Sequence, residues 1–170
     1  DFRSSEKTYQ LLTQVSGRAG RHELAGEVII QSYTPEHYAI ILASKQDFDD
    51  FFAHEMQIRR QNHYPPYYYI TLVTVTHEDL MTVVSVTEKI TKYLRSGLSS
   101  KSIILGPAAS PIPKINNRYR YQCLIKYKRE PELNEKLRKI ISHYQQDMVQ
   151  KGFQIFVDVN PQIMMFQLRI

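Results

Sequence analysis

Apolar residues at helical and alternating spacing divide the chain into a shorter N-terminal part and a longer C-terminal part. Four C-terminal segments rich in β-branched and aromatic residues are predicted to be strands: residues 67–76, 103–107, 118–128 and 155–159. Between them, helical spacing predicts one helix from Leu80 to a C-cap at Gly97 and another from Pro131 to Gly152. The order β-α-β-β-α-β is typical of a ferredoxin-like α+β sandwich, with two helices on one face of a four-stranded sheet.

The N-terminal part predicts elements that do not complete a fold. We expect a helix capped by Ser4 or Ser5 and running to Val15, a strand at residues 27–33 buried on both faces, and a helix at residues 37–44 with Pro35 near its first turn. One strand cannot form a sheet alone, so residues 1–43 indicate the edge of a larger α/β layer.

A linker helix and a proline hinge separate these two parts. Residues 44–62 predict a polar helix with one apolar stripe, formed by Phe48, Phe51, Phe52 and Met56. Tyr64-Pro65-Pro66 then ends the helix, because proline removes a donor and restricts the residue before it. The predicted organisation is therefore 1–43, a linker at 44–66, and a C-terminal domain at 67–170.

Composition narrows the class of protein. Of 170 residues, 42% are hydrophobic and 23% charged, which is ordinary for a folded chain. A single cysteine, Cys123, excludes an intramolecular disulfide and a multi-cysteine zinc site in these residues. No run of 18 apolar residues occurs, so we expect no membrane span, and without a secretory signature we expect the cytoplasm. The chain starts at Asp1 and not at Met, which we interpret as a processed product or a piece of a longer protein.

The formal charge of +5 concentrates in one predicted strand. From Lys114, before the strand at residues 118–128, to Arg129, just after it, six cations occur without an acidic residue between them: Lys114, Arg118, Arg120, Lys126, Lys128 and Arg129. Period-two alternation gives this strand a cationic face and an aromatic-apolar face around Cys123. Such a row suits nucleic-acid phosphates, and it equally suits the solvated side of an amphipathic strand. The tyrosines of the other face, and those around Pro65-Pro66, are interpreted as packing residues before base-stacking ones.

A second cationic feature has the spacing Gln14-x-x-Gly17-Arg18-x-Gly20-Arg21. Two arginines three residues apart on one helical turn could both reach a triphosphate, although a solvated Gly-Arg loop would also have this composition. No G-x-x-x-x-G-K-[ST] stretch occurs, so the phosphate cradle and magnesium ligands of a complete nucleotide site are missing. No H-E-x-x-H or C-x-x-C occurs either, and Cys123 is expected to be a packed thiol, so no metal site is predicted.

The arginine-glycine spacing resembles motif VI of superfamily 2 helicases, and the residues that follow it resemble the C-terminal end of the PriA family of bacterial primosomal replication-restart helicases (primosomal protein N′). The resemblance is carried by residues 13–21, 26–31, Arg59 with 64–66, 105–108, 118–121 and 157–162. Residues 166–170 have no counterpart in it.

This resemblance implies that residues 1–43 end the second, RecA-like helicase lobe and that the following domain binds DNA. Arg18 and Arg21 would reach ATP across the lobe cleft, and Gln14 would couple that site to lobe movement. The complete protein would be an ATP- and magnesium-dependent 3′-to-5′ DNA helicase with zinc in an upstream domain. The piece itself would bind single-stranded and forked DNA, hydrolyse no ATP and contain no cofactor.

The family's partners, by the same resemblance, include single-stranded DNA-binding protein and primosome loaders. Two other functions stay open from the fold alone: a stand-alone module for single-stranded nucleic acid, and a regulatory domain for a small ligand.

Overall fold

Two units divide the chain, Asp1–Asn62 and His63–Ile170, each defined by the contacts within it. The computed structural model describes residues 1–19 and 26–161. The division lies inside the predicted linker at residues 44–66.

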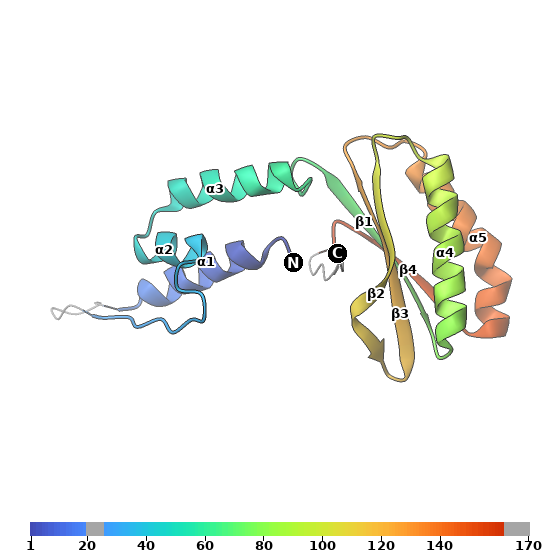
Figure 1. Ribbon diagram of the computed structural model, residues 1–170, viewed down its shortest axis with the longest axis horizontal. Helices are drawn as coiled ribbons and strands as arrows, with labels where there is room; N and C mark the ends of the chain where they lie inside the picture. The colour runs from blue at the N-terminus through green and yellow to red at the C-terminus, as the bar shows by residue number, and fades with distance from the viewer. Residues whose placement is uncertain (20–25, 162–170) are drawn as a thin grey trace. The chain divides into compact units, whose positions relative to one another are not determined.

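The described residues of the first unit form three helices, α1 (Ser4–Ser16), α2 (Tyr38–Ser44) and α3 (Phe48–Gln61) (Figure 1). His37 caps α2, since its Nδ1 accepts from the Ala39 amide, and Asp47 caps α3 by accepting from the Asp50 amide. The expected serine cap of α1 is wrong, because Arg3 occupies the N-cap and makes no side-chain capping bond. The single helix expected at residues 44–62 instead begins at Phe48.

The core of this unit is small and largely aromatic. The Tyr9 ring stacks on that of Phe51 with 4.1 Å between centroids, and Ala39 and Ala43 of α2 complete the buried set. Of the predicted stripe on α3, Phe51 is buried, whereas Phe48 and Phe52 are exposed by 60% and 52%. The stripe therefore turns only one of its phenylalanines fully into this core.

A buried carboxylate joins the three helices. Glu55 of α3 accepts from the Tyr38 hydroxyl at 2.6 Å and from Arg59 Nε at 2.7 Å. Arg59 Nη2 also donates to Glu6 of α1 at 2.7 Å. Burial and the hydrogen bond to Glu55 raise the pKa of Tyr38 to about 12.

The strand expected at residues 27–33 is wrong. Residues 26–31 have no regular secondary structure, Ile29 is 86% exposed, and the Tyr33 side chain is fully exposed. A strand needs a neighbour for its main-chain bonds, and the described residues of this unit offer none.

The second unit has the predicted order β-α-β-β-α-β. Its elements are β1 (Tyr69–His77), α4 (Leu80–Gly97), β2 (Ile103–Ile115), β3 (Arg118–Tyr127), α5 (Leu133–Lys151) and β4 (Gln154–Val159). The strands form an antiparallel sheet in the order β2-β3-β1-β4. This α+β fold is the class expected from the sequence, and its topology is consistent with a ferredoxin-like sandwich.

Both helices cover the same face of the sheet (Figure 1). Val73 and Ile125 of the central strands, Ile90 of α4 and Ile140 of α5 belong to one buried cluster. Gly152 adopts φ of 71° as the C-cap of α5, which is the helix end predicted from the sequence.

β2 extends well beyond the predicted residues 103–107 and runs along one edge of the sheet. Its pairing with β3 shifts register between Leu105 and Ala108 and again between Ala109 and Lys114. An edge position tolerates its prolines, which cannot donate to a neighbouring strand: Pro107, Pro111 and Pro113.

Candidate nucleic-acid interface

β3 carries two chemically different faces, as its alternation predicts. Cys123 and Ile125 are fully buried in the cluster beneath the helices. Gln122 faces the other side, where its Nε2 donates to Thr74 Oγ1 at 3.3 Å. Burial raises the pKa of the Cys123 thiol, which agrees with a packed thiol and disfavours a thiolate nucleophile. The cations at even-numbered positions of β3 therefore point away from the helices.

Arg118, the first of these cations, makes internal contacts. Its Nε donates to Thr76 Oγ1 at 3.2 Å, and its Nη2 donates to the Thr76 main-chain oxygen at 3.1 Å and to the Gly152 oxygen. Gly152 caps the C-terminal end of α5, where a positive charge is favourable. Arg118 thus joins β3 and β1 to α5, and most of its donors face protein oxygens.

Lys126 lies under an aromatic ring. Only 7% of the residue is exposed, and its Nζ is 3.8 Å from the centroid of the Tyr64 ring. Burial lowers the pKa of Lys126, because desolvation disfavours the ammonium. The expected open row of cations is therefore interrupted here, since the segment that contains Tyr64 covers the side chain.

Two further cations lie over tyrosine rings at the surface. Lys114 Nζ is 4.5 Å from the ring centroid of Tyr119, and Lys128 Nζ is 5.2 Å from that of Tyr68. Both lysines are exposed. A cation over a ring keeps its charge available to a further anion, so both remain able to bind phosphate.

Arg120 and Arg129 have no salt bridge or hydrogen bond to the described residues. Arg120 is half-buried on β3, and Arg129 is exposed just after the strand. Lys101, in the turn before β2, is also exposed and without such a partner. Together with Lys114 and Lys128, these three side chains are cations of β2, β3 and the adjoining turns that remain available to an anion.

The basic stretch is longer than the predicted site. No Asp or Glu occurs between Glu88 and Glu130, whereas ten cations do: Lys89, Lys92, Arg95, Lys101, Lys114, Arg118, Arg120, Lys126, Lys128 and Arg129. The sequence reasoning missed those before Lys114, although the absence of acidic residues was visible. The stretch runs through the second half of α4, then β2 and β3, which adjoin in the sheet.

This stretch of β2, β3 and the end of α4 is called the basic side below. Arg95 of α4 joins its parts, because its Nη2 donates to the main-chain oxygens of Ile104 and Gly106 on β2. The acidic residues that follow, from Glu130 onward, belong to α5, its preceding turn and β4. Because α4 lies on one face of the sheet and the even-numbered cations of β3 lie on the other, a polyanion that contacts both sets would pass around the β2 edge.

The residues of the arginine-glycine feature lie in the first unit. Gln14 is exposed on the last turns of α1. α1 ends at Ser16 with Gly17 as its C-cap, so Arg18 follows the helix, and Arg21 lies outside the described residues. The expectation that both arginines share one helical turn is therefore wrong for Arg18. Its exposed guanidinium could still reach a phosphate.

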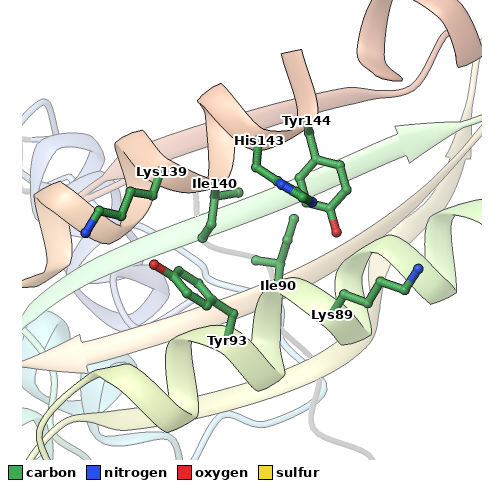
Figure 2. Close-up of a pocket in the computed structure, with 7 residues that line it drawn as sticks. All are labelled: Lys89, Ile90, Tyr93, Lys139, Ile140, His143 and Tyr144. Atoms are coloured by element: carbon green, nitrogen blue, oxygen red, sulfur yellow. The ribbon is translucent and has the colours of Figure 1, made fainter. Parts of the chain in front are cut away.

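A groove between α4 and α5 is a feature that the sequence did not predict. It encloses about 420 Å³ over Ile90 and Ile140, between the rings of Tyr93 and Tyr144. Figure 2 shows Lys89 and Lys139 pointing away from each other at its two ends. Lys139 is ion-paired with Glu135, so one of the two charges is already compensated.

The described residues contain no cluster of three or more His, Cys, Asp or Glu side chains that could hold a metal ion. None of the helices in residues 1–19 and 26–161 is long and apolar enough to cross a membrane.

The fold and the basic side together define a class of protein. The second unit is an α+β module with two helices on one sheet face and a surface suited to a polyanion. Its sequence matches the model of the primosomal protein N C-terminal domain over residues 60–162. The chain belongs to this family.

Curated relatives agree with that family. The chain is 54% identical over 165 residues to the replication restart protein PriA of Bacillus subtilis, which covers 97% of this chain and 20% of that protein. It is 41% identical over 127 residues to PriA of Synechocystis, covering 75% of this chain and 15% of that protein. It is 31% identical over 166 residues to PriA of Haemophilus influenzae, covering 95% of this chain and 22% of that protein. The chain thus spans about a fifth of these relatives.

Proposed function

We propose that this chain binds DNA as the C-terminal part of a replication-restart helicase, and that the basic side is the contact surface. The observation that carries the proposal is the absence of acidic residues from Lys89 to Arg129, combined with cations there that make no salt bridge or hydrogen bond to the described residues, Lys101, Arg120 and Arg129 among them. Phosphate contacts are the main source of affinity in such complexes, and they need available cations more than a particular pocket.

In the complete protein this end would help to recognise stalled or branched forks in the cytoplasm. Strand separation, 3′-to-5′ and driven by ATP with magnesium, would belong to the helicase lobes, and zinc to another domain. Gln14, Arg18 and Arg21 would complete the ATP site, because arginines stabilise charge on a transferred phosphoryl group. Single-stranded DNA-binding protein and primosome loaders are the partners that we propose for the whole assembly. The family membership supports this over a stand-alone binding module.

The affinity of the 170-residue chain for labelled single-stranded and forked DNA, measured by fluorescence anisotropy from low to moderate salt, tests the contact surface. We expect log affinity to fall linearly with log salt. The triple variant Lys101→Gln, Arg120→Gln, Arg129→Gln should bind more weakly, with the slope reduced by about 2, since each lost phosphate contact on single strands removes about 0.7.

A matched control removes three cations that are already paired. Lys7, Lys139 and Lys151 each form an exposed salt bridge with a carboxylate. Changing these three to glutamine lowers the net charge equally and should leave most of the slope intact. Equal losses in both triple variants would show a general charge effect and overturn the assigned surface. No binding at low salt would overturn the proposed DNA-binding function.

The helicase part of the proposal needs the full-length protein. Arg18→Ala and Arg21→Ala should each collapse DNA-stimulated ATP turnover while leaving DNA affinity nearly unchanged. Arg60→Ala, an exposed arginine on α3, is the control and should keep turnover. Normal turnover in either arginine variant would remove that residue from the ATP site.

A further inference from the structure

Tyrosines gather where β1 begins and β3 ends. Tyr69 and Tyr127 are register partners on these strands. Their rings stack with 5.8 Å between centroids and 29° between planes. The pair is asymmetric, because Tyr127 packs against the core cluster of the unit, whereas Tyr69 is 55% exposed. An inner ring thus supports an outer ring that faces solvent.

The inner ring is fixed from two directions. Besides its contact with the core, the Tyr127 hydroxyl lies 3.4 Å from Thr71 Oγ1. Thr71 is fully buried on β1, two residues after Tyr69. The outer ring of Tyr69 makes no hydrogen bond to the described residues. Exposure of the apolar Tyr69 ring to water is unfavourable. Because the Tyr127 ring beneath it is fixed, the Tyr69 ring is already organised to stack on a flat ligand.

The surface next to Tyr69 is apolar as well. Val159 of β4 pairs with Thr71, so its side chain lies on the same sheet face as Tyr69. Val159 is 60% exposed. Together they form a small exposed apolar strip at the end of the sheet, beyond the core cluster.

Cations follow this strip directly in the sequence. Lys128 and Arg129 come after Tyr127, and both are exposed. The nearest acidic residue, Glu130, is buried and accepts from the Ser99 amide at 2.9 Å and from Ser102 Oγ at 2.7 Å. Its charge is therefore directed into the turn before β2 and is screened from the strip. An aromatic surface with uncompensated cations beside it matches the two parts of an unpaired nucleotide, the base and the phosphate.

We propose that Tyr69, supported by Tyr127, is a stacking platform for an unpaired base, with Lys128 and Arg129 on the neighbouring phosphates. This inference rests on the proposed DNA-binding function and adds to it a site selective for single strands. A duplex keeps its bases stacked inside, so it could use only the cations. An apolar protein segment is the competing occupant of the strip.

The test compares oligo-dT with an abasic oligonucleotide of equal length and phosphate number, on the 170-residue chain. The unchanged chain should bind oligo-dT at least about fivefold more tightly, because one stacked base contributes that much or more. Tyr69→Ala should abolish this preference and keep the salt slope. Tyr69→Phe should retain the preference. Tyr33→Ala, at a fully exposed tyrosine of the first unit, is the matched control and should also retain it.

A second readout does not depend on affinity. The chain contains no tryptophan, so Tyr69→Trp introduces a single indole at the platform. Its fluorescence should be quenched by oligo-dT and much less by the abasic strand. Equal affinity for both strands, or a preference that persists in Tyr69→Ala, would overturn the platform while leaving DNA binding standing. Failure to bind either strand would overturn both. If both strands bind tightly but neither quenches the indole, the bases do not stack at Tyr69. The strip would then be assigned to another partner, such as a protein segment.

Discussion

The guanidinium of Arg118 on β3 donates to the main-chain oxygen of Gly152, the residue that caps the C-terminal end of α5. The same side chain donates to the main-chain oxygen of Thr76 on β1 at 3.1 Å. One arginine therefore holds two strands and a helix end together. The sequence predicts Arg118 as a DNA contact. Because its guanidinium is bound to main-chain oxygens of the protein, removal of this side chain should affect folding first.

Arg118→Gln should destabilise the chain by about 1–2 kcal/mol, since hydrogen bonds from a charged donor to main-chain oxygens are lost at a helix terminus. Arg120→Gln, two residues further along the same face, should change stability by less than about 0.5 kcal/mol. Urea unfolding of both variants measures the difference. Similar midpoints for the two would mean that the Arg118 bonds contribute nothing beyond an ordinary surface charge.

The hydrogen bond between Tyr38 and Glu55 predicts that the stability of the first unit falls at alkaline pH. The folded-state pKa of Tyr38, about 12, is above the usual value of 10.0, so the folded state holds the proton longer than the unfolded state. Stability is therefore full below pH 10 and falls as pH rises toward 12. The absorbance change at 295 nm, taken as the chain minus Tyr38→Phe, should have its midpoint near that value. Glu55→Gln should move the midpoint back toward 10, and a midpoint already near 10 would contradict the network.

The Glu130 carboxylate predicts that stability falls as the pH is lowered, the opposite direction to the effect of Tyr38. Burial raises its pKa, but the hydrogen bonds from Ser102 and Ser99 outweigh that effect and hold the pKa of the carboxyl below its usual value. Stability from this group is therefore present above pH 4.5 and is lost as pH falls through the depressed pKa. Glu130→Gln should flatten the fall in unfolding free energy on acidification, measured by urea titrations at several pH values. An unchanged slope would show that the group does not contribute.

The sequence predicts the second unit well because its patterns are local. Period-two strands, helical spacing on α4 and α5 and the glycine at position 152 each describe a few neighbouring residues, and all agree with one topology. The strand expected at residues 27–33 is wrong because its apolar run satisfies the same local pattern without a strand to pair with in the described residues. Pairing is a property of distant segments, and local spacing does not contain it.

The candidate site shows the same limit. Alternation correctly places Arg118, Arg120 and Lys126 on one face of β3. It does not indicate that Tyr64, more than sixty residues earlier, covers Lys126, or that α5 ends within reach of Arg118. Those contacts decide which cations remain available, so the useful part of the predicted row is Arg120 with Lys114 before the strand and the two cations after it.

Gly106 is the position where the fold itself excludes a side chain. Its φ is +106°, which L-residues rarely adopt, and an added Cβ would lie 2.7 Å from the main-chain oxygen of Gln122 on β3. That oxygen belongs to the neighbouring strand, so relief of the collision would separate β2 from β3. Gly106→Ala should therefore cost about 2 kcal/mol or more in unfolding free energy.

Gly152→Ala is the matched control, because φ there is +71° but no atom lies within 4 Å of the added Cβ. It should cost only about 1 kcal/mol for the backbone conformation. Chemical denaturation of the two variants isolates the collision, and equal costs would show that the β2–β3 pairing at Gly106 can yield.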